Sequence, residues 1–183
     1  MSREKSDSLY HLVKSLSKNE KRYFRIFAES RNGKEKKTLQ LFDTLNAQSA
    51  FDDEFILSSN PDFNRDQLSN MKAELYKQLL HALRLYHEGK NIGLKIRQHI
   101  DFAQLLIDRC LYKQASEQLK KGKKYASKHD NLELMLEISR LEKSIISHLI
   151  DNNNEKRVNK IIAEVSHINE KINRVNKMTN LDA

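Results

Sequence analysis

Residues that break helices are almost absent from this chain. Its 183 residues include one proline, Pro61, and four glycines. Proline interrupts a helix because it lacks a backbone N–H group and clashes with the preceding turn, and glycine weakens a helix through its conformational freedom. Apolar residues recur three and four positions apart through most of the chain, which places them on one side of a helix. The sequence therefore predicts an all-α protein of amphipathic helices.

Polar and glycine-containing turns separate the expected helices. Ser17 and Glu20 have the spacing of a capping box, in which a hydroxyl and a carboxylate accept hydrogen bonds from free N–H groups at the start of a helix. Pro61 excludes a helix through 58–62. We divide the chain near this loop into an N-terminal helical subdomain, 1–62, and a helical repeat region, 63–183. Helices are expected at about 7–16, 18–29, 34–47, 52–58, 65–87, 92–109, 112–128, 131–150 and 155–178.

The stretch 99–126 has the pattern of two amphipathic helices joined by a tight turn. Small residues occupy the positions where the two helices meet, namely Ala103, Ala115 and Gly122. Small side chains allow helices to approach closely, and we expect Phe102 and Leu119 to fill the remaining space. Such a hairpin buries its apolar face only when neighbouring helices stack on it.

This hairpin resembles a tetratricopeptide repeat. Phe102 and Ala103 match the large–small pair of the family's first helix, and Cys110–Ala115 matches its Gly-x-Tyr-x-x-Ala turn with Cys in place of Gly. The chain has no tryptophan, and one unit of the family's ~34 residues matches. The resemblance implies antiparallel helical hairpins stacked as a short α-solenoid, and a role in binding a protein or peptide without catalysis.

The first helix of such a hairpin would line a concave face. Arg97, Gln104 and Asp108 are seven and four residues apart and so share a stripe on that helix. The resemblance implies that these three side chains contact a partner, and the alternative is that they form a solvated helix surface. On this basis the chain is expected to be a non-catalytic protein–protein interaction scaffold.

The net charge of +8 is distributed unevenly and supports an alternative function. Residues 1–37 contain 11 Lys and Arg against 5 Asp and Glu, whereas 38–90 contain 5 against 8. Basic patches bind the phosphates of nucleic acids, although surface lysines are often only solvated. The alternative is thus a basic nucleic-acid-associated regulatory protein. Its candidate residues are Lys21, Arg22 and Arg25 in one cluster and Lys120, Lys121, Lys123, Lys124 and Lys128 in another.

The residues that enzymes and metal sites need are not arranged in recognisable motifs. The sequence has no glycine-rich phosphate loop and no nucleophile elbow, and none of its seven histidines is four residues from another. We therefore expect no catalytic, cofactor-binding or metal-binding residues. One cysteine, Cys110, indicates a reducing compartment, and no stretch has the length of a signal peptide core or a membrane span. The expected location is the cytoplasm.

The last expected helix carries a narrow apolar seam. Its members alternate by three and four: Val158, Ile161, Val165, Ile168, Ile172 and Val175. Such a seam packs along one neighbouring helix or pairs with a second chain. Packing within the chain is the favoured interpretation, and the alternatives are a homodimer through 155–178 or contact with a further repeat.

Overall fold

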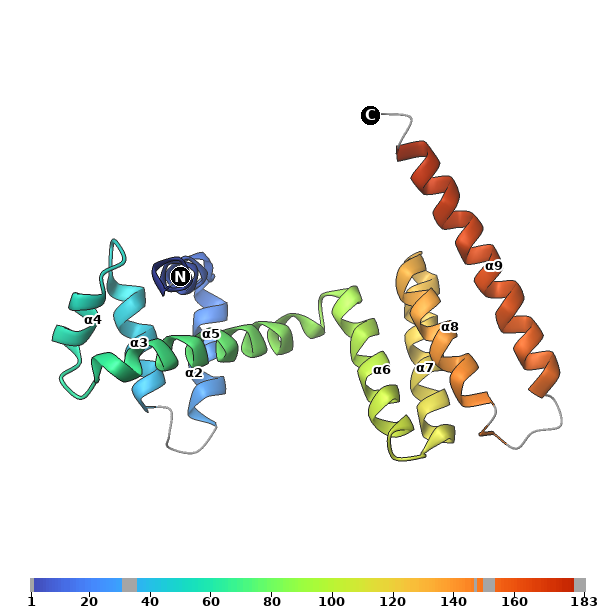
Figure 1. Cartoon of the computed structure of the whole chain (residues 1–183), viewed down its shortest axis with the longest axis horizontal. Helices are drawn as coiled ribbons and strands as arrows, with labels where there is room; N and C mark the ends of the chain where they lie inside the picture. Colours follow the sequence, from blue (N-terminus) through green and yellow to red (C-terminus); the bar gives the residue numbers. More distant parts are fainter. Residues whose placement is uncertain (1, 31–35, 147, 150–153, 180–183) are drawn as a thin grey trace. The chain divides into compact units, whose positions relative to one another are not determined.

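The computed structural model describes residues 2–30, 36–146, 148–149 and 154–179. Within these residues the chain forms nine α-helices and no β-strand, which confirms the predicted all-α class (Figure 1). No helix in the described part is long and apolar enough to cross a membrane. The helices are α1 (Ser2–Ser15), α2 (Lys18–Glu29), α3 (Lys36–Ala47), α4 (Asp53–Ser59), α5 (Arg65–Glu88), α6 (Ile92–Ile107), α7 (Tyr112–Lys128), α8 (Leu132–Ile146) and α9 (Asn154–Thr179).

The contacts divide the chain into two compact units, Met1–His87 and Glu88–Ala183. Each unit has a hydrophobic core of its own. The boundary therefore lies after His87, whereas the sequence analysis placed it after residue 62. The physical reason is α5, whose apolar stripe packs into the core of the first unit through Leu75 and Leu79.

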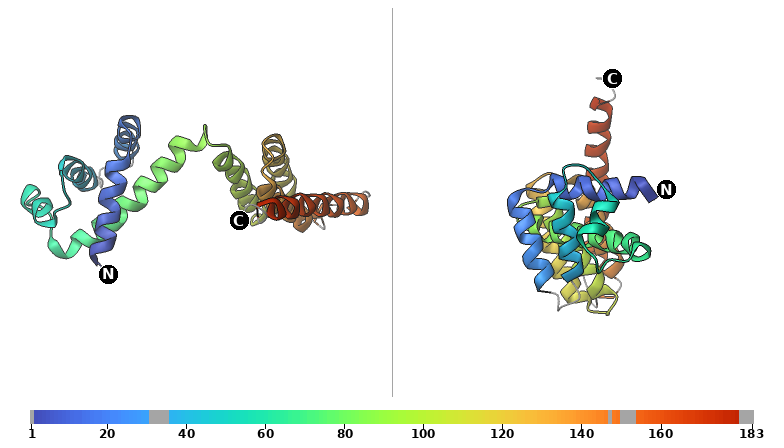
Figure 2. Two further views of the ribbon diagram at one scale, coloured as in Figure 1. Left: turned by 90° about the horizontal axis from the view of Figure 1, so that it is seen from above. Right: turned by 90° about the vertical axis from the view of Figure 1, so that its left-hand side faces the viewer.

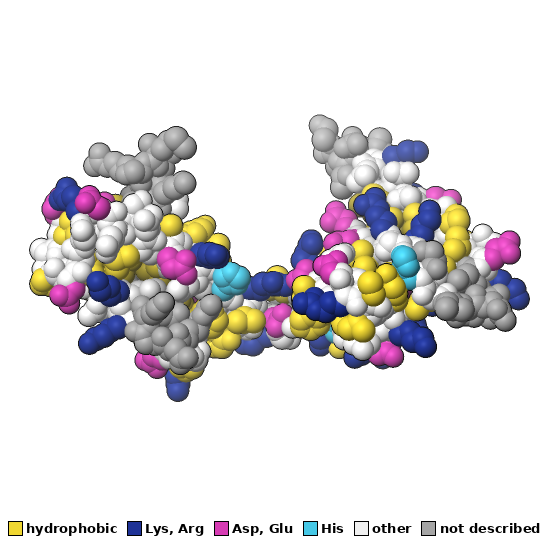
Figure 3. All heavy atoms as spheres, turned by 60° about the horizontal axis from the view of Figure 1, so that its bottom comes forward, with side chains coloured by type: hydrophobic (Ala, Val, Ile, Leu, Met, Phe, Trp, Pro, Cys, Tyr) yellow, Lys and Arg dark blue, Asp and Glu magenta, His cyan; other side chains and the backbone are white. Residues whose placement is uncertain are grey.

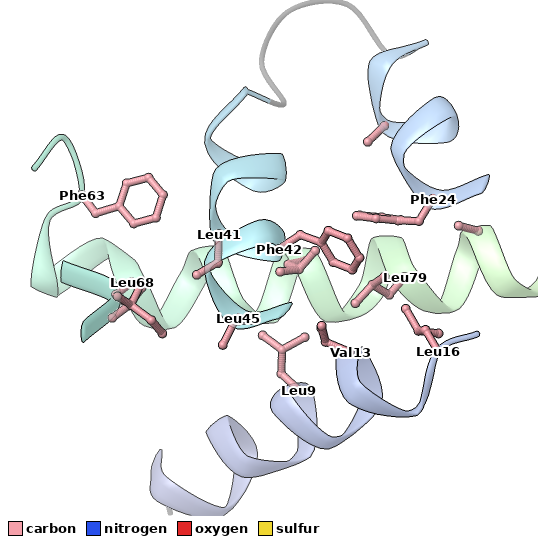
Figure 4. Packing of buried hydrophobic residues seen from close by; sticks show 14 residues of the cluster. Leu9, Val13, Leu16, Phe24, Leu41, Phe42, Leu45, Phe63, Leu68 and Leu79 are labelled. Atoms are coloured by element: carbon pink, nitrogen blue, oxygen red, sulfur yellow. The ribbon is translucent and has the colours of Figure 1, made fainter. Parts of the chain in front are cut away.

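The core of the first unit is formed by side chains that converge from α1, α2, α3 and α5 (Figure 4). Phe24 and Phe42 lie at its centre, with ring centroids 4.8 Å apart. The predicted capping box starts α2: Ser17 Oγ accepts the Glu20 N–H and a Glu20 carboxylate oxygen accepts the Ser17 N–H. These bonds from Ser17, together with His87 Nε2 at 2.6 Å, lower the pKa of Glu20.

In the second unit α6, α7 and α8 lie side by side as an antiparallel row, and α9 packs against α8 (Figures 1 and 2). Ala103, Ala115, Leu119 and Gly122 are buried, as the sequence predicts. Phe102 is not: its side chain is 43% exposed, so its predicted position between the helices is wrong. Adjacent residues of a helix point about 100° apart, and α7 and α8 cover the Ala103 side of α6.

Gly122 lies where three helices come together. A Cβ atom at this position would be 3.2 Å from Cβ of His99 on α6 and 3.3 Å from Cδ1 of Ile138 on α8. Ordinary contacts between such atoms are longer than 3.4 Å. The absence of a side chain at Gly122 therefore allows α6, α7 and α8 to pack at their observed separation.

The turn between α6 and α7 has a left-handed residue at Cys110, whose φ angle is 58°. The Leu111 N–H donates to the Leu106 carbonyl at 2.9 Å and the Cys110 N–H donates to the Ile107 carbonyl at 2.8 Å, which closes the end of α6 as a Schellman-type turn. Cys110 therefore adopts a conformation in which glycine would have no steric penalty.

Replacing Cys110 with glycine should stabilise the second unit. The left-handed conformation costs a residue with a Cβ atom about 1–2 kcal/mol, part of which is offset by the greater freedom of glycine in the unfolded chain. We expect a net gain of about 0.5–1 kcal/mol in a urea unfolding titration. Asp130→Gly is the matched control, because Asp130 also has a positive φ angle, 47°, but aspartate tolerates it better and the gain should be smaller.

Part of the apolar seam of α9 is covered by α8. Ile168 is 1% exposed and Ile161 is 8% exposed, so packing within the chain accounts for these two members of the seam. Val175 and Met178, nearer the end of α9, are exposed. A homodimer through 155–178 stays a prediction.

Candidate binding surfaces

The three residues predicted to contact a partner lie on the exposed side of α6. Arg97 reaches across to α8, where its Nη1 lies 3.9 Å from Oε2 of Glu137. The Gln104 amide donates to Oδ1 of Asp108 at 2.9 Å, and Asp108 is the residue that caps the end of α6. The structure thus places Gln104 and Asp108 together and links Arg97 to a different helix.

The link to Glu137 identifies residues that the sequence reasoning missed. Glu137 belongs to a stripe on α8 whose members are three and four residues apart: Glu133, Glu137, Arg140 and Ser144. Glu137 is half-buried and the other three are exposed. The spacing of this stripe was available in the sequence, but its position beside α6 depends on how α6, α7 and α8 pack.

Together the two stripes form one polar surface, which we name the α6–α8 face. Four of its side chains are carboxylates and two are arginines, so the surface carries an excess of negative charge in a chain that is basic overall. Its members are Arg97, Asp101, Gln104, Asp108, Glu133, Glu137, Arg140 and Ser144.

One lysine of the predicted C-terminal basic cluster is not available to a ligand. Lys123 is half-buried between helices, and its Nζ lies 2.5 Å from Glu142 on α8 and 2.7 Å from Glu164 on α9. Burial opposes the charged form of Lys123, but the two carboxylates outweigh it and raise the pKa of Lys123. The assignment of Lys123 to an anion-binding patch is therefore corrected: this side chain ties α7 to α8 and α9.

The other lysines of the cluster are exposed on the outer side of α7. Lys113 lies on the same side of α7, since steps of three or four positions lead from it through the exposed Glu117 to the other four lysines. We name the set the α7 lysine face: Lys113, Lys120, Lys121, Lys124 and Lys128. No ion pair involves any of them within the described part of the chain.

Tyr125 lies at the edge of the α7 lysine face, next to Lys95 of α6. Lys95 of α6 lies over the ring, with its Nζ 4.2 Å from the centroid, and His99 stacks on Tyr125 at 5.8 Å. The Lys95 ammonium is the largest cause of a lowered pKa for Tyr125, and Lys124 and Lys121 add to it. Lys95 therefore places a positive charge at this edge of α7.

The predicted N-terminal basic cluster is mostly engaged by α3. Lys21 donates to Oδ1 of Asn46 at 2.7 Å, and Arg25 pairs with Asp43 at 2.7 Å. Arg22 is exposed. This cluster thus presents less free charge than its sequence suggests.

On the face drawn in Figure 3, charged and hydrophobic side chains of each unit are interspersed among the described residues.

A cleft of about 740 Å³ lies in the first unit between α1, α4 and α5. Its charged side chains pair with acidic neighbours, Lys72 with Asp53 and Arg65 with Glu54. A second cleft, of about 430 Å³, is bordered by Cys110 and by Tyr112, which stacks on His148 at 4.3 Å. The Cys110 side chain raises the pKa of Tyr112.

Among the described residues, no three His, Cys, Asp or Glu side chains gather in a way that could hold a metal ion. The comparisons with known proteins identify no relative, since no family model, curated protein or solved structure matches the chain. The two charged surfaces of the second unit, the α6–α8 face and the α7 lysine face, are therefore the features that bear on function.

Proposed function

We propose that this chain is a non-catalytic scaffold that binds a protein partner on the α6–α8 face. The observation that carries the proposal is the Arg97–Glu137 contact, because it joins the exposed stripes of α6 and α8 into one surface. Two buried helix contacts, α6 with α7 and α7 with α8, hold the backbones beneath this surface. A preorganised surface loses little entropy when a partner binds, which favours recognition.

The resemblance to tetratricopeptide repeats agrees with this assignment. In stacked hairpins of that family the first helices of successive repeats line one side, and on this proposal α6 and α8 take those two positions. Asp101, Asp108, Glu133 and Glu137 then favour a partner segment that contains lysine or arginine. Each exposed ion pair contributes about 0.2–1 kcal/mol, so several of them are needed for useful affinity.

Asp108→Lys tests the proposal without disturbing α6. Asp108 lies at the carboxyl end of the helix, where a positive side chain interacts favourably with the helix dipole, so the fold should tolerate the change. We expect the variant to bind a basic peptide partner at least about tenfold more weakly, because charge reversal repels the partner. Partners are first captured from a cell lysate on the intact chain, and the affinity of the identified binding segment is then measured by calorimetry.

The matched control is Glu29→Lys, which makes the same charge change on an exposed residue of the first unit. Its affinity for the partner segment should equal that of the unchanged chain. Equal weakening by both variants would mean that net charge rather than the α6–α8 face governs binding, and unchanged binding by Asp108→Lys would place the partner elsewhere.

A further inference from the structure

We infer that the α7 lysine face is a docking surface for the phosphate backbone of duplex DNA. This surface is separate from the α6–α8 face. The buried side of α7, formed by Ala115, Leu119 and Gly122, contacts α6 and α8, and the lysines project from the opposite side of the helix. A phosphate backbone at these lysines would thus avoid the carboxylates of the α6–α8 face.

The lysines of the α7 lysine face extend along most of the helix. From Lys113 to Lys128 the helix rises about 22 Å, at ~1.5 Å per residue. Duplex DNA carries about one phosphate charge per 1.7 Å of its axis, so a helix laid along it meets many phosphates within reach of flexible lysines. Glu117 is the one acidic side chain within this row, against five lysines. The row therefore has the charge and length to neutralise several phosphates at once.

Lys123 is engaged by two acidic side chains and so does not belong to the α7 lysine face. Glu142 of α8 and Glu164 of α9 both pair with Lys123, so one of their two negative charges is balanced beneath the surface. These two carboxylates therefore pair with Lys123 and not with the exposed lysines. Lys95 of α6, whose Nζ lies 4.2 Å from the centroid of the Tyr125 ring, adds a further positive charge at the edge of the row.

The surface fits duplex better than single-stranded DNA. Proteins that bind single strands without sequence preference stack the bases on exposed aromatic rings. Tyr125 is the aromatic residue beside these lysines, and its ring is half-buried and already in contact with Lys95 and His99. Contacts to phosphates alone position a protein on the backbone without reading bases, so binding should be independent of sequence.

The test is a fluorescence-anisotropy titration of the full chain with a labelled 20-base-pair duplex at several salt concentrations. The variant replaces Lys120, Lys121 and Lys124 with glutamine, which removes three charges and retains helix propensity. We expect its affinity at low salt to fall at least about tenfold, and the slope of log affinity against log salt to become shallower by about 2.7. Single variants Lys120→Gln and Lys124→Gln should each reduce the slope by about 0.9.

The matched control replaces three exposed lysines of α9 with glutamine: Lys160, Lys171 and Lys177. It changes the net charge equally and should leave affinity and slope nearly unchanged. Equal losses in the two triple variants, tighter binding of the corresponding single strand, or no binding of the intact chain at low salt would each overturn the inference. Asp108→Lys should not weaken duplex binding, which separates this result from the test of the protein-binding proposal.

Discussion

Replacing Gly122 with leucine should destabilise the second unit by about 2–3 kcal/mol, the largest effect that we expect there. A Cβ atom alone would lie 3.2 Å from His99 and 3.3 Å from Ile138, and leucine adds three more carbon atoms. Leucine is a better helix former than glycine by roughly 0.8 kcal/mol, which offsets only part of this strain. Urea unfolding, followed by the ellipticity of the helices, measures the change in the free energy of unfolding.

The same substitution at Gly89 is the control. Nothing lies within 4 Å of a Cβ atom built at Gly89, so leucine there meets no neighbour and should change stability by less than about 0.5 kcal/mol. Amide hydrogen exchange locates the effect of Gly122→Leu, with protection expected to fall in α6, α7 and α8. Equal stability of the Gly122→Leu and Gly89→Leu variants would contradict the close packing of these three helices.

Replacing Phe42 with alanine should destabilise the first unit by about 3–5 kcal/mol. Phe42 is fully buried, and its ring lies 4.8 Å from that of Phe24 and contacts the Arg25 guanidinium at 5.3 Å. Its removal leaves a cavity at the centre of the cluster shown in Figure 4 and exposes no new surface to water. Thermal and urea unfolding measure the loss, and hydrogen exchange should assign it to α1, α2, α3 and α5.

Phe55→Ala provides the comparison for Phe42→Ala. Phe55 has the same side chain but is 45% exposed on α4, so its truncation removes less buried apolar area. The loss should be well below that for Phe42, about 1 kcal/mol or less. A Phe42→Ala variant as stable as Phe55→Ala would exclude the core described here.

The resemblance to a helical repeat predicted correctly which small residues are buried, but it did not predict the direction in which the Phe102 side chain points. Ala103, Ala115 and Gly122 are buried as predicted, because only small residues fit where helices approach closely. Phe102 was assigned to the same contact because it is large and adjacent to Ala103. Its exposure shows that composition at a position does not determine which side of a helix receives a neighbour.

For the candidate surfaces, too, the sequence predicted which residues share one side of a helix but not which helices lie side by side. Arg97, Gln104 and Asp108 share a stripe that follows from spacing alone, and the structure leaves all three exposed. The contact of Arg97 with Glu137 could not be predicted, because it joins helices that are separated in the chain by α7. Lys123 was grouped with its neighbours by sequence, and only the positions of Glu142 and Glu164 distinguish it.

The sequence by itself determined that the chain is helical, where α2 starts, and that Ala103, Ala115 and Gly122 are buried. These properties are local: they depend on the absence of helix breakers, on a capping box at Ser17 and Glu20, and on an apolar period that matches one helix. The tertiary structure decided that α5 belongs to the first unit, that Lys123 pairs with Glu142 and Glu164, and that α6 and α8 share a face. These properties depend on which helix lies beside which, and that choice is made by the packing of whole faces rather than by any one segment.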